Sequence, residues 1–141
     1  MIVTGAVRND GLTSQLVPEG YPAVASPDIV AALRRAARGG KNVHEGLALT
    51  NAVFYTKEII GSNLRLWQKA GVKAVEMECA ALFVMAGLEG RECGAILTVD
   101  GNPLLERDEE MTGYDPHREV VREAVGRMIG IALDALVDDR P

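Results

Sequence analysis

Two carboxylates separated by a single methionine are the residues with the clearest chemical potential in this sequence. Glu76 and Glu78 flank Met77, and the segment "VEMECAALFVM" (residues 75–85) then becomes almost wholly apolar. Charged side chains are rarely buried without partners. The acids could therefore occupy the first turn of a helix, where the helix dipole favours negative charge. Alternatively, they could bind a polar ligand, since one carboxylate can accept hydrogen bonds from two neighbouring sugar hydroxyls.

Two further segments carry side chains with possible roles. Asp100 lies in "TVDGNP" (residues 98–103), after an apolar stretch, where turn residues are common. A catalytic acid at that position would need its pKa raised by burial. Phe54 and Tyr55 could stack on a planar base or could belong to the core. The residue pattern leaves both alternatives open in each case.

Several kinds of site are not indicated. His44 and His117 lie far apart with no ligand spacing around them, so we expect no metal site. The chain has no GxGxxG, Walker, GxSxG or HExxH motif. An anionic group would need glycine-rich backbone amides or several arginines. Arg8 in "GAVRNDG" is the only arginine beside a glycine-containing loop at a strand end, which is too little for a clamp.

Composition narrows the class of protein. A chain of 141 residues corresponds to about one domain and can bury a core. The net charge of −5 argues against nucleic acid or an anionic membrane as a partner, and no apolar run is long enough to span a bilayer. Cys79 and Cys93 form no CxxC pair and lie in apolar surroundings. We interpret them as buried thiols in a reducing compartment, which predicts a cytoplasmic protein.

Strand patterns alternate with helix patterns along the chain. This alternation predicts an α/β fold with a mostly parallel sheet flanked by helices. Ligands of such sheets collect at the carboxyl ends of the strands, where Glu76, Glu78 and Asp100 are expected. The last helix carries an apolar stripe that ends at Leu136. The predicted strands cover residues 1–7, 42–50, 72–77 and 92–102, the helices cover 26–40, 63–71, 79–90 and 116–137, and residues 8–25 form a long loop.

Five segments occur in the order seen in nucleoside phosphorylases of the uridine and hexameric purine type. They are "GAVRNDG", "PEGYPAVASPDIV", "NAVFY", "VEMECAALFVMAGLEG" and "GAILTVDGNP". From residue 2 to about residue 137, the chain resembles the C-terminal half to three-fifths of such an enzyme, and it is most similar to uridine-phosphorylase-like members. The resemblance implies the C-terminal part of that α/β fold, with its mixed, mostly parallel sheet.

The resemblance also implies roles for individual residues. Glu78 matches the carboxylate that binds the ribose 2′ and 3′ hydroxyls, and Met77 matches the side chain packed under the sugar. Glu76 matches an acid of the base and sugar pocket, and Phe54 matches the aromatic ring that closes over the base. Asp100 lies one place from the acid that helps to protonate the base in the purine branch, so a catalytic role for it is an expectation.

The implied activity is phosphorolysis of a nucleoside, of the uridine type, to the free base and ribose 1-phosphate. Phosphate would be a co-substrate, with no metal or other cofactor, and the protein would be a homo-oligomer. In the family, the phosphate-binding glycine loop and arginines precede the equivalent of Ile2. We therefore expect residues 1–141 to form a single partial domain without that segment. Two alternatives stay open: a nucleoside hydrolase or nucleosidase, and a non-catalytic module that forms oligomers.

Overall fold

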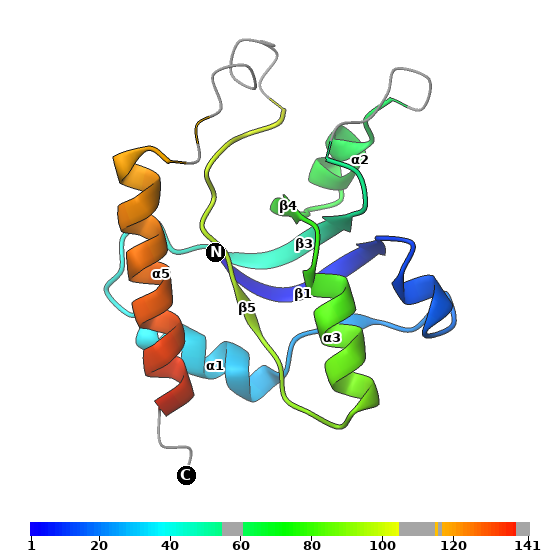
Figure 1. Ribbon diagram of the computed structural model, residues 1–141, viewed down its shortest axis with the longest axis horizontal. Coiled ribbons are helices and arrows are strands. Elements are labelled where there is room, and N and C mark those ends of the chain that lie inside the picture. Colours follow the sequence, from blue (N-terminus) through cyan, green and yellow to red (C-terminus); the bar gives the residue numbers. More distant parts are fainter. Residues whose placement is uncertain (55–60, 105–114, 116, 138–141) are drawn as a thin grey trace.

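The computed structural model of the chain describes residues 1–54, 61–104, 115 and 117–137 (Figure 1). Tyr55, which the sequence pairs with Phe54, lies outside these residues. The described part of the chain alternates strands with helices, as the sequence predicts, and the α/β class is confirmed.

The sheet is organised around strand β1 (Ile2–Asn9). β1 pairs in parallel with β3 (Glu45–Asn51), and β3 pairs in parallel with β4 (Ala74–Glu76). The opposite edge of β1 carries two short antiparallel strands, β2 (Ala23–Val24) and β5 (Ala95–Ile96). The strand order is β2-β1-β3-β4, with β5 beside the start of β1.

The parallel register brings three strand ends together. Asn9 at the end of β1 is the partner of Asn51 at the end of β3, and Thr50 is the partner of Glu76 at the end of β4. Carboxyl ends of parallel strands form one edge of the sheet, where α/β proteins usually place their ligands. In this chain, that edge carries polar side chains from all three strands.

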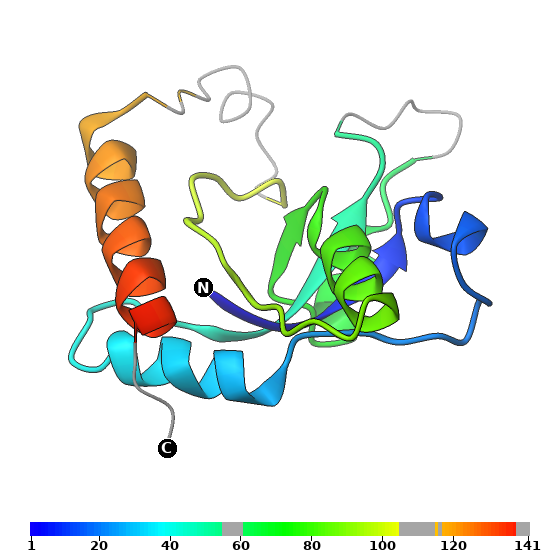
Figure 2. The same cartoon turned by 60° about the horizontal axis from the view of Figure 1, so that its bottom comes forward.

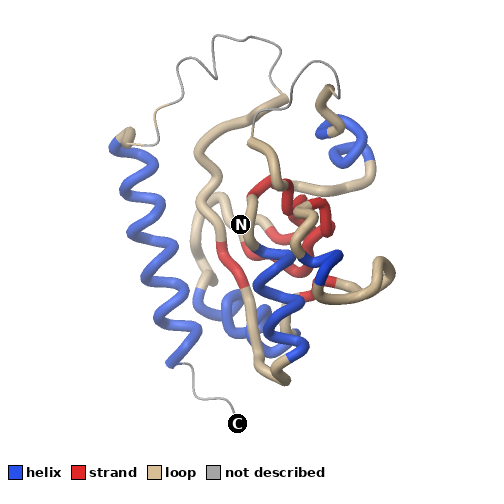
Figure 3. Tube along the Cα trace, turned by 45° about the vertical axis from the view of Figure 1, so that its right-hand side comes forward, coloured by secondary structure: helices blue, strands red, loops and turns tan. Residues whose placement is uncertain are grey.

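Helices cover the sheet and extend to one side of it. Helix α3 (Cys79–Leu88) packs on β1, β2 and β3, while α1 (Pro27–Ala36) packs on β1 and on α5 (Glu119–Val137). Figure 2 shows α1 below the strands and α3 and α5 at opposite sides. The tube in Figure 3 shows the strands gathered in the middle and α5 along one flank. Helix α2 (Leu64–Lys69) precedes β4, and a short 3-10 turn (Thr13–Gln15) follows β1.

One apolar cluster joins these elements. β1 contributes Ile2 and Val3, and α3 contributes Phe83 and Val84, all of which are almost completely buried. Burying an aliphatic or aromatic side chain of this size stabilises a fold by about 1.5–3 kcal/mol. The rest of the buried cluster consists of Val17, Ala23, Ala25, Val30, Ala32, Leu33, Ala37, Ala48, Cys79, Ala80 and Ala135.

Helix α5 packs with the predicted face, except at the last residue of the predicted stripe. Val121 and Ala135 are buried, and Met128 lies between them at the same heptad spacing. Leu136, which the sequence places in the packed stripe, is 70% exposed because it follows Ala135 and points about 100° away around the helix. No helix in the described ranges is long and apolar enough to cross a membrane.

The helix boundaries carry residues that are typical of helix ends, with one difference. Pro27 occupies the first helical position of α1, Asp28 lies in the first turn, and α3 ends before Gly90, whose φ of 60° suits glycine. The Ser26 side chain does not cap α1, although Ser26 is the N-cap residue. Its Oγ instead accepts a hydrogen bond from the N–H of Cys93 at 2.8 Å.

Two strand predictions differ from the structure. The predicted loop over residues 8–25 contains the 3-10 turn and β2, and the strand predicted over 92–102 is reduced to Ala95–Ile96. The second difference has a simple cause. β5 pairs with Ile2 and Val3, while β2 occupies Gly5 and Ala6 on β1, so β5 has only a short stretch of β1 to pair with.

Candidate functional site

A buried hydroxyl connects the ends of β3 and β4. Thr50 is completely buried, and its Oγ1 donates to Oε1 of Glu76 at 2.5 Å. The same oxygen accepts the backbone N–H of Ala80, in the first turn of α3, at 2.9 Å. The two strands and the helix are therefore joined at one threonine.

The Glu76 carboxylate holds the turn that leads into α3. Its Oε2 accepts the N–H of Glu78 at 2.7 Å and the N–H of Cys79 at 2.6 Å. The first N–H groups of a helix have no partner within the helix, and a negative charge there interacts favourably with the helix dipole. Glu76 therefore acts as the capping side chain of α3, which is the structural alternative that the sequence left open for these acids.

Glu78 and Met77 face outward at the same turn. Glu78 is the N-cap residue of α3, but its side chain makes no capping bond, and it is exposed to solvent. Its Oε2 lies 3.3 Å from the N–H of Met77, whose side chain is 42% exposed. Because Glu76 supplies the cap, the Glu78 carboxylate has lone pairs to offer to a ligand.

Polar and aromatic residues after β3 extend this surface. The Asn9 amide donates to Oδ1 of Asn51 at 2.7 Å, and the Asn51 amide donates to the Val53 carbonyl at 2.7 Å. Phe54 follows directly and is 56% exposed. A ring exposed to that extent is not a core residue, so Phe54 presents an aromatic surface near the end of β3.

Asp100 lies on a different segment from the carboxylates. It follows β5, is half-buried, and its backbone oxygen accepts a hydrogen bond from Nη2 of Arg118 at 2.8 Å, just before α5. The structure thus brings Glu76, Met77 and Glu78 together at one turn and connects Asp100 to the beginning of α5.

Arg8 is used by the fold. Its guanidinium donates to Oγ1 of Thr13 and to the carbonyl oxygens of Thr13, Val17, Pro18, Glu19 and Tyr21, at 2.6–3.3 Å. The segment that follows β1 therefore wraps around this side chain. With its donors so engaged, Arg8 organises a loop rather than offering an anion site.

The two cysteines are free thiols, as the sequence predicts, but only Cys79 is buried, while Cys93 is half-buried. Burial raises the pKa of Cys79, and the nearby Glu76 carboxylate raises it further. Burial also raises the pKa of Cys93. Both thiols therefore stay protonated at neutral pH, whereas a nucleophile or a metal ligand would need the thiolate. Within the described residues there is no cluster of three or more potential metal ligands.

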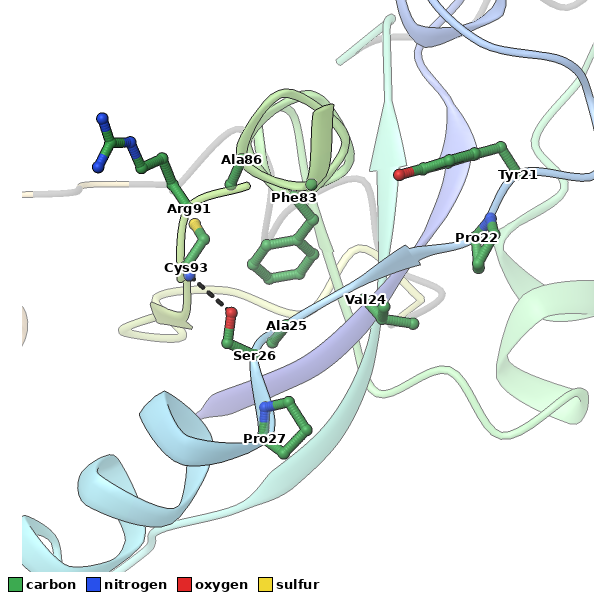
Figure 4. Close-up of a pocket in the computed structure, with 11 residues that line it drawn as sticks. Tyr21, Pro22, Val24, Ala25, Ser26, Pro27, Phe83, Ala86, Arg91 and Cys93 are labelled. Carbon is green, nitrogen blue, oxygen red and sulfur yellow. Dashed lines mark hydrogen bonds between the residues drawn. The ribbon is translucent and has the colours of Figure 1, made fainter. Parts of the chain in front are cut away.

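A pocket of about 230 Å³ lies between α3 and the segment before α1 (Figure 4). Phe83 and Ala86 of α3 form one side of it, and the segment before α1 forms the other. Ala86 lies seven residues along α3 from Cys79, which is roughly 10 Å along the helix axis. The pocket is therefore separate from the turn that carries Glu78. The remaining lining residues are Tyr21, Pro22, Val24, Ala25, Ser26, Pro27, Gly87, Arg91 and Cys93.

Sequence reasoning did not find Thr50, Asn9 or Asn51. Each of them ends or nearly ends a strand. For Asn9 and Asn51, a polar residue at the end of an apolar strand was the signal in the sequence that could have indicated a place in the site. The role of Thr50 depends on its register with Glu76, twenty-six positions away in sequence. That register follows only from the strand pairing.

Comparison with known proteins identifies relatives across almost the whole chain. The sequence profile of the phosphorylase superfamily matches residues 1–138. Purine nucleoside phosphorylase from Plasmodium vivax is 36% identical over 134 residues, which cover 94% of this chain and 53% of the relative. Uridine phosphorylase from Klebsiella aerogenes is 26% identical over 148 residues, covering 96% of this chain and 56% of the relative.

A solved structure gives the same result at the level of the fold. The crystal structure of purine nucleoside phosphorylase from Toxoplasma gondii in complex with immucillin-H superposes with a TM-score of 0.83 at 30% identity. The superposition covers 95% of this chain and 53% of that one. The chain thus spans about half the length of the relatives that it matches.

Proposed function

The chain belongs to the phosphorylase superfamily, and we propose that it carries the nucleoside-binding half of a nucleoside phosphorylase site. The observation that supports this proposal is the position of Glu78. Its carboxylate is exposed at the carboxyl end of the sheet, and the cap formed by Glu76 leaves it available. A carboxylate so placed can accept hydrogen bonds from the two hydroxyls of a ribose. Its negative charge also favours the positive charge that develops on the sugar when the N-glycosidic bond breaks.

The neighbouring side chains suit a nucleoside. Met77 offers an apolar surface beside Glu78, against which a sugar ring can pack, and Phe54 offers a ring on which a base can stack. We assign Asp100 to the site as the acid that protonates the leaving base. Glu76 lies in the same segment, but its oxygens already accept three hydrogen bonds, so we propose an indirect role for it below.

For the base, we propose a purine. Over the aligned residues, the purine nucleoside phosphorylase from Plasmodium vivax is 36% identical to this chain, against 26% for the uridine phosphorylase from Klebsiella aerogenes. This proposal departs from the uridine-type preference predicted from the sequence. Uridine remains the second candidate, since the uridine phosphorylase matches over 96% of this chain.

Phosphate is the co-substrate in this proposal, and its binding residues would come from the part of the superfamily fold that the chain does not match. Arg8, beside the glycine-containing loop, has its guanidinium engaged by Thr13 and by loop carbonyls. A complete site would then combine the residues of this chain with that other part of the superfamily fold. We also expect the protein to act as a homo-oligomer.

Calorimetric titration of the 141-residue chain with inosine, guanosine and uridine tests the nucleoside site. We expect saturable binding with a preference for the two purine nucleosides. A preference for uridine would overturn the assignment of the base and leave the ribose site intact. If none of the three binds, whether or not phosphate is present, the proposed function is wrong.

A product assay separates the two possible reactions. The chain is incubated with inosine, alone and with the unmatched part of the Plasmodium vivax relative supplied as a separate polypeptide, in the presence or absence of phosphate. Phosphorolysis predicts ribose 1-phosphate that forms only with phosphate. Release of free ribose at a rate independent of phosphate would instead identify a nucleosidase. Binding without any product would favour a non-catalytic module.

A further inference from the structure

We propose that Thr50 and Glu76 are positioning residues, which fix the turn before α3 so that Glu78 points toward the ligand. This inference rests on the proposed function, because it concerns how the carboxylate of that site is held. Neither residue needs to touch the nucleoside in this arrangement.

The hydrogen bonds around Glu76 leave it little capacity for a ligand. Oε1 accepts from the Thr50 hydroxyl, and Oε2 accepts two backbone N–H groups. A carboxylate offers about four lone pairs, and three are used here. Glu76 also supplies the negative charge that the helix dipole favours at this end. Its contacts are therefore those of a side chain that holds backbone in place.

Thr50 fixes the orientation of that carboxylate. The hydroxyl donates to Glu76 and accepts from the N–H of Ala80, so both of its functions are used. It is completely buried, so water cannot easily replace it if it is removed. The Glu76 carboxylate and the first turn of α3 are then connected through a single buried atom.

The effect reaches Glu78 through its own backbone. Glu78 has φ −128° and ψ −30°, which is not helical, and its N–H is held by Glu76. If that bond is lost, the turn can relax, and the Glu78 side chain becomes free to cap α3 itself. Its carboxylate would then be withdrawn from the ligand.

Three variants of the full chain test this: Thr50→Val, Thr50→Ser and Thr98→Val. Valine keeps the shape of Thr50 but removes the hydroxyl, and serine restores the hydroxyl. Thr98 is the matched control, because its hydroxyl donates to Sδ of Met128 on α5, away from the turn. For each variant, amide hydrogen exchange is followed by NMR at residues 78–80, and inosine affinity is measured by calorimetry.

We expect Thr50→Val to speed exchange at residues 78–80 at least tenfold and to weaken inosine binding about tenfold. Thr50→Ser should stay within about twofold of the parent chain in both measurements, as should Thr98→Val. Recovery with serine distinguishes the hydroxyl's role from a general loss of packing.

Two results would overturn the proposal. One is exchange at residues 78–80 that is no faster in Thr50→Val than in Thr98→Val. The other is faster exchange with unchanged inosine affinity. If the parent chain binds no nucleoside, the proposed function fails and the ligand-positioning role fails with it. The exchange data would then still decide whether Thr50 holds the turn, so the two failures can be distinguished.

Discussion

Ser26 and Cys93 are joined by two hydrogen bonds across 67 positions of the sequence. The N–H of Ser26 donates to the Cys93 carbonyl at 2.7 Å, and the N–H of Cys93 donates to Oγ of Ser26 at 2.8 Å. These two hydrogen bonds connect the start of α1 to the segment that leads into β5. The Ser26 side chain, which does not cap α1, therefore holds the segment before β5 in place.

Removal of this hydroxyl should destabilise the fold. Ser26→Ala leaves the N–H of Cys93 without its partner, and we expect a loss of about 1–2 kcal/mol in the free energy of unfolding. Ser14→Ala is the control, since that exposed hydroxyl donates only to the carbonyl of Gly11 and should change stability by less than about 0.5 kcal/mol. Urea unfolding measures both. Equal losses in the two variants would contradict the assigned role of Ser26.

Replacing Arg8 with lysine should loosen the loop that follows β1. Lysine keeps the charge but lacks the planar fork that reaches several carbonyl oxygens at once. We expect Arg8→Lys to cost about 2 kcal/mol or more in the free energy of unfolding and to expose residues 10–22 to limited proteolysis. Arg38→Lys, at an exposed position, should do neither. An intact loop in Arg8→Lys would mean that the carbonyl contacts are dispensable.

Two glycine-to-alanine substitutions should have opposite effects on stability. At Gly94, a Cβ atom would lie 2.3 Å from Cγ2 of Ile29, so Gly94→Ala should destabilise by about 1–3 kcal/mol. At Gly126, within α5, no atom lies within 4 Å of the added methyl, so Gly126→Ala should stabilise by about 0.5–1 kcal/mol. Thermal unfolding of both variants checks this. A neutral Gly94→Ala would show that Ile29 can move aside.

The buried thiol predicts a loss of stability at alkaline pH. Burial, and secondly Glu76, raise the pKa of Cys79 in the folded chain, while an unfolded thiol titrates near 8.5. Above that pH, the unfolded state loses its proton first, so stability falls by up to about 1.4 kcal/mol per pH unit. Cys79→Ala removes this titration and leaves Cys93 unchanged. The free energy of unfolding, measured from pH 7.5 to 10, should therefore fall more steeply for the parent chain than for the variant. A constant difference would contradict this.

Two exposed glutamates at opposite ends of α3 provide a matched pair for the ligand site. Glu78→Ala should weaken inosine binding about 10- to 100-fold, because it removes a charged hydrogen-bond acceptor. Glu89→Ala, at the C-terminal end of α3, should leave the affinity unchanged. Neither change should alter the melting temperature by more than a few degrees, since both side chains are exposed. Equal affinities in the two variants would exclude Glu78 as the ribose ligand.

The sequence predicted most of the features that are set by nearby residues. Pro27 and Gly90 mark helix ends through their own backbone preferences, and Asp28 does so through its charge in the first turn; the helices that they delimit are confirmed. Features set by distant residues were missed. β2 is only two residues long and exists because β1 offers it an edge, and no local pattern records such a pairing.

The same division applies to the candidate site. The sequence located Glu76, Met77 and Glu78 at a strand end, and the structure places them there. It could not show that Glu76 accepts three hydrogen bonds and that Glu78 accepts fewer, because one of the three comes from Thr50 on another strand and the other two depend on the conformation of the turn. Their binding roles stay predictions until a ligand is measured.

Strands β2 and β5 share one edge of β1, and this arrangement has a consequence for the order of folding. Joining β1 to β3 pairs residues along nearly the whole of both strands. Joining β1 to β5 pairs only two residues, beside a contact between Met1 and Leu97 that spans 96 positions. Loop closure costs more as the loop lengthens, by about 0.6 kcal/mol for each doubling, and this short strand gains little in return. We therefore expect β5 to join the sheet last and to leave it first, so that residues 95–97 separate from β1 before the core unfolds.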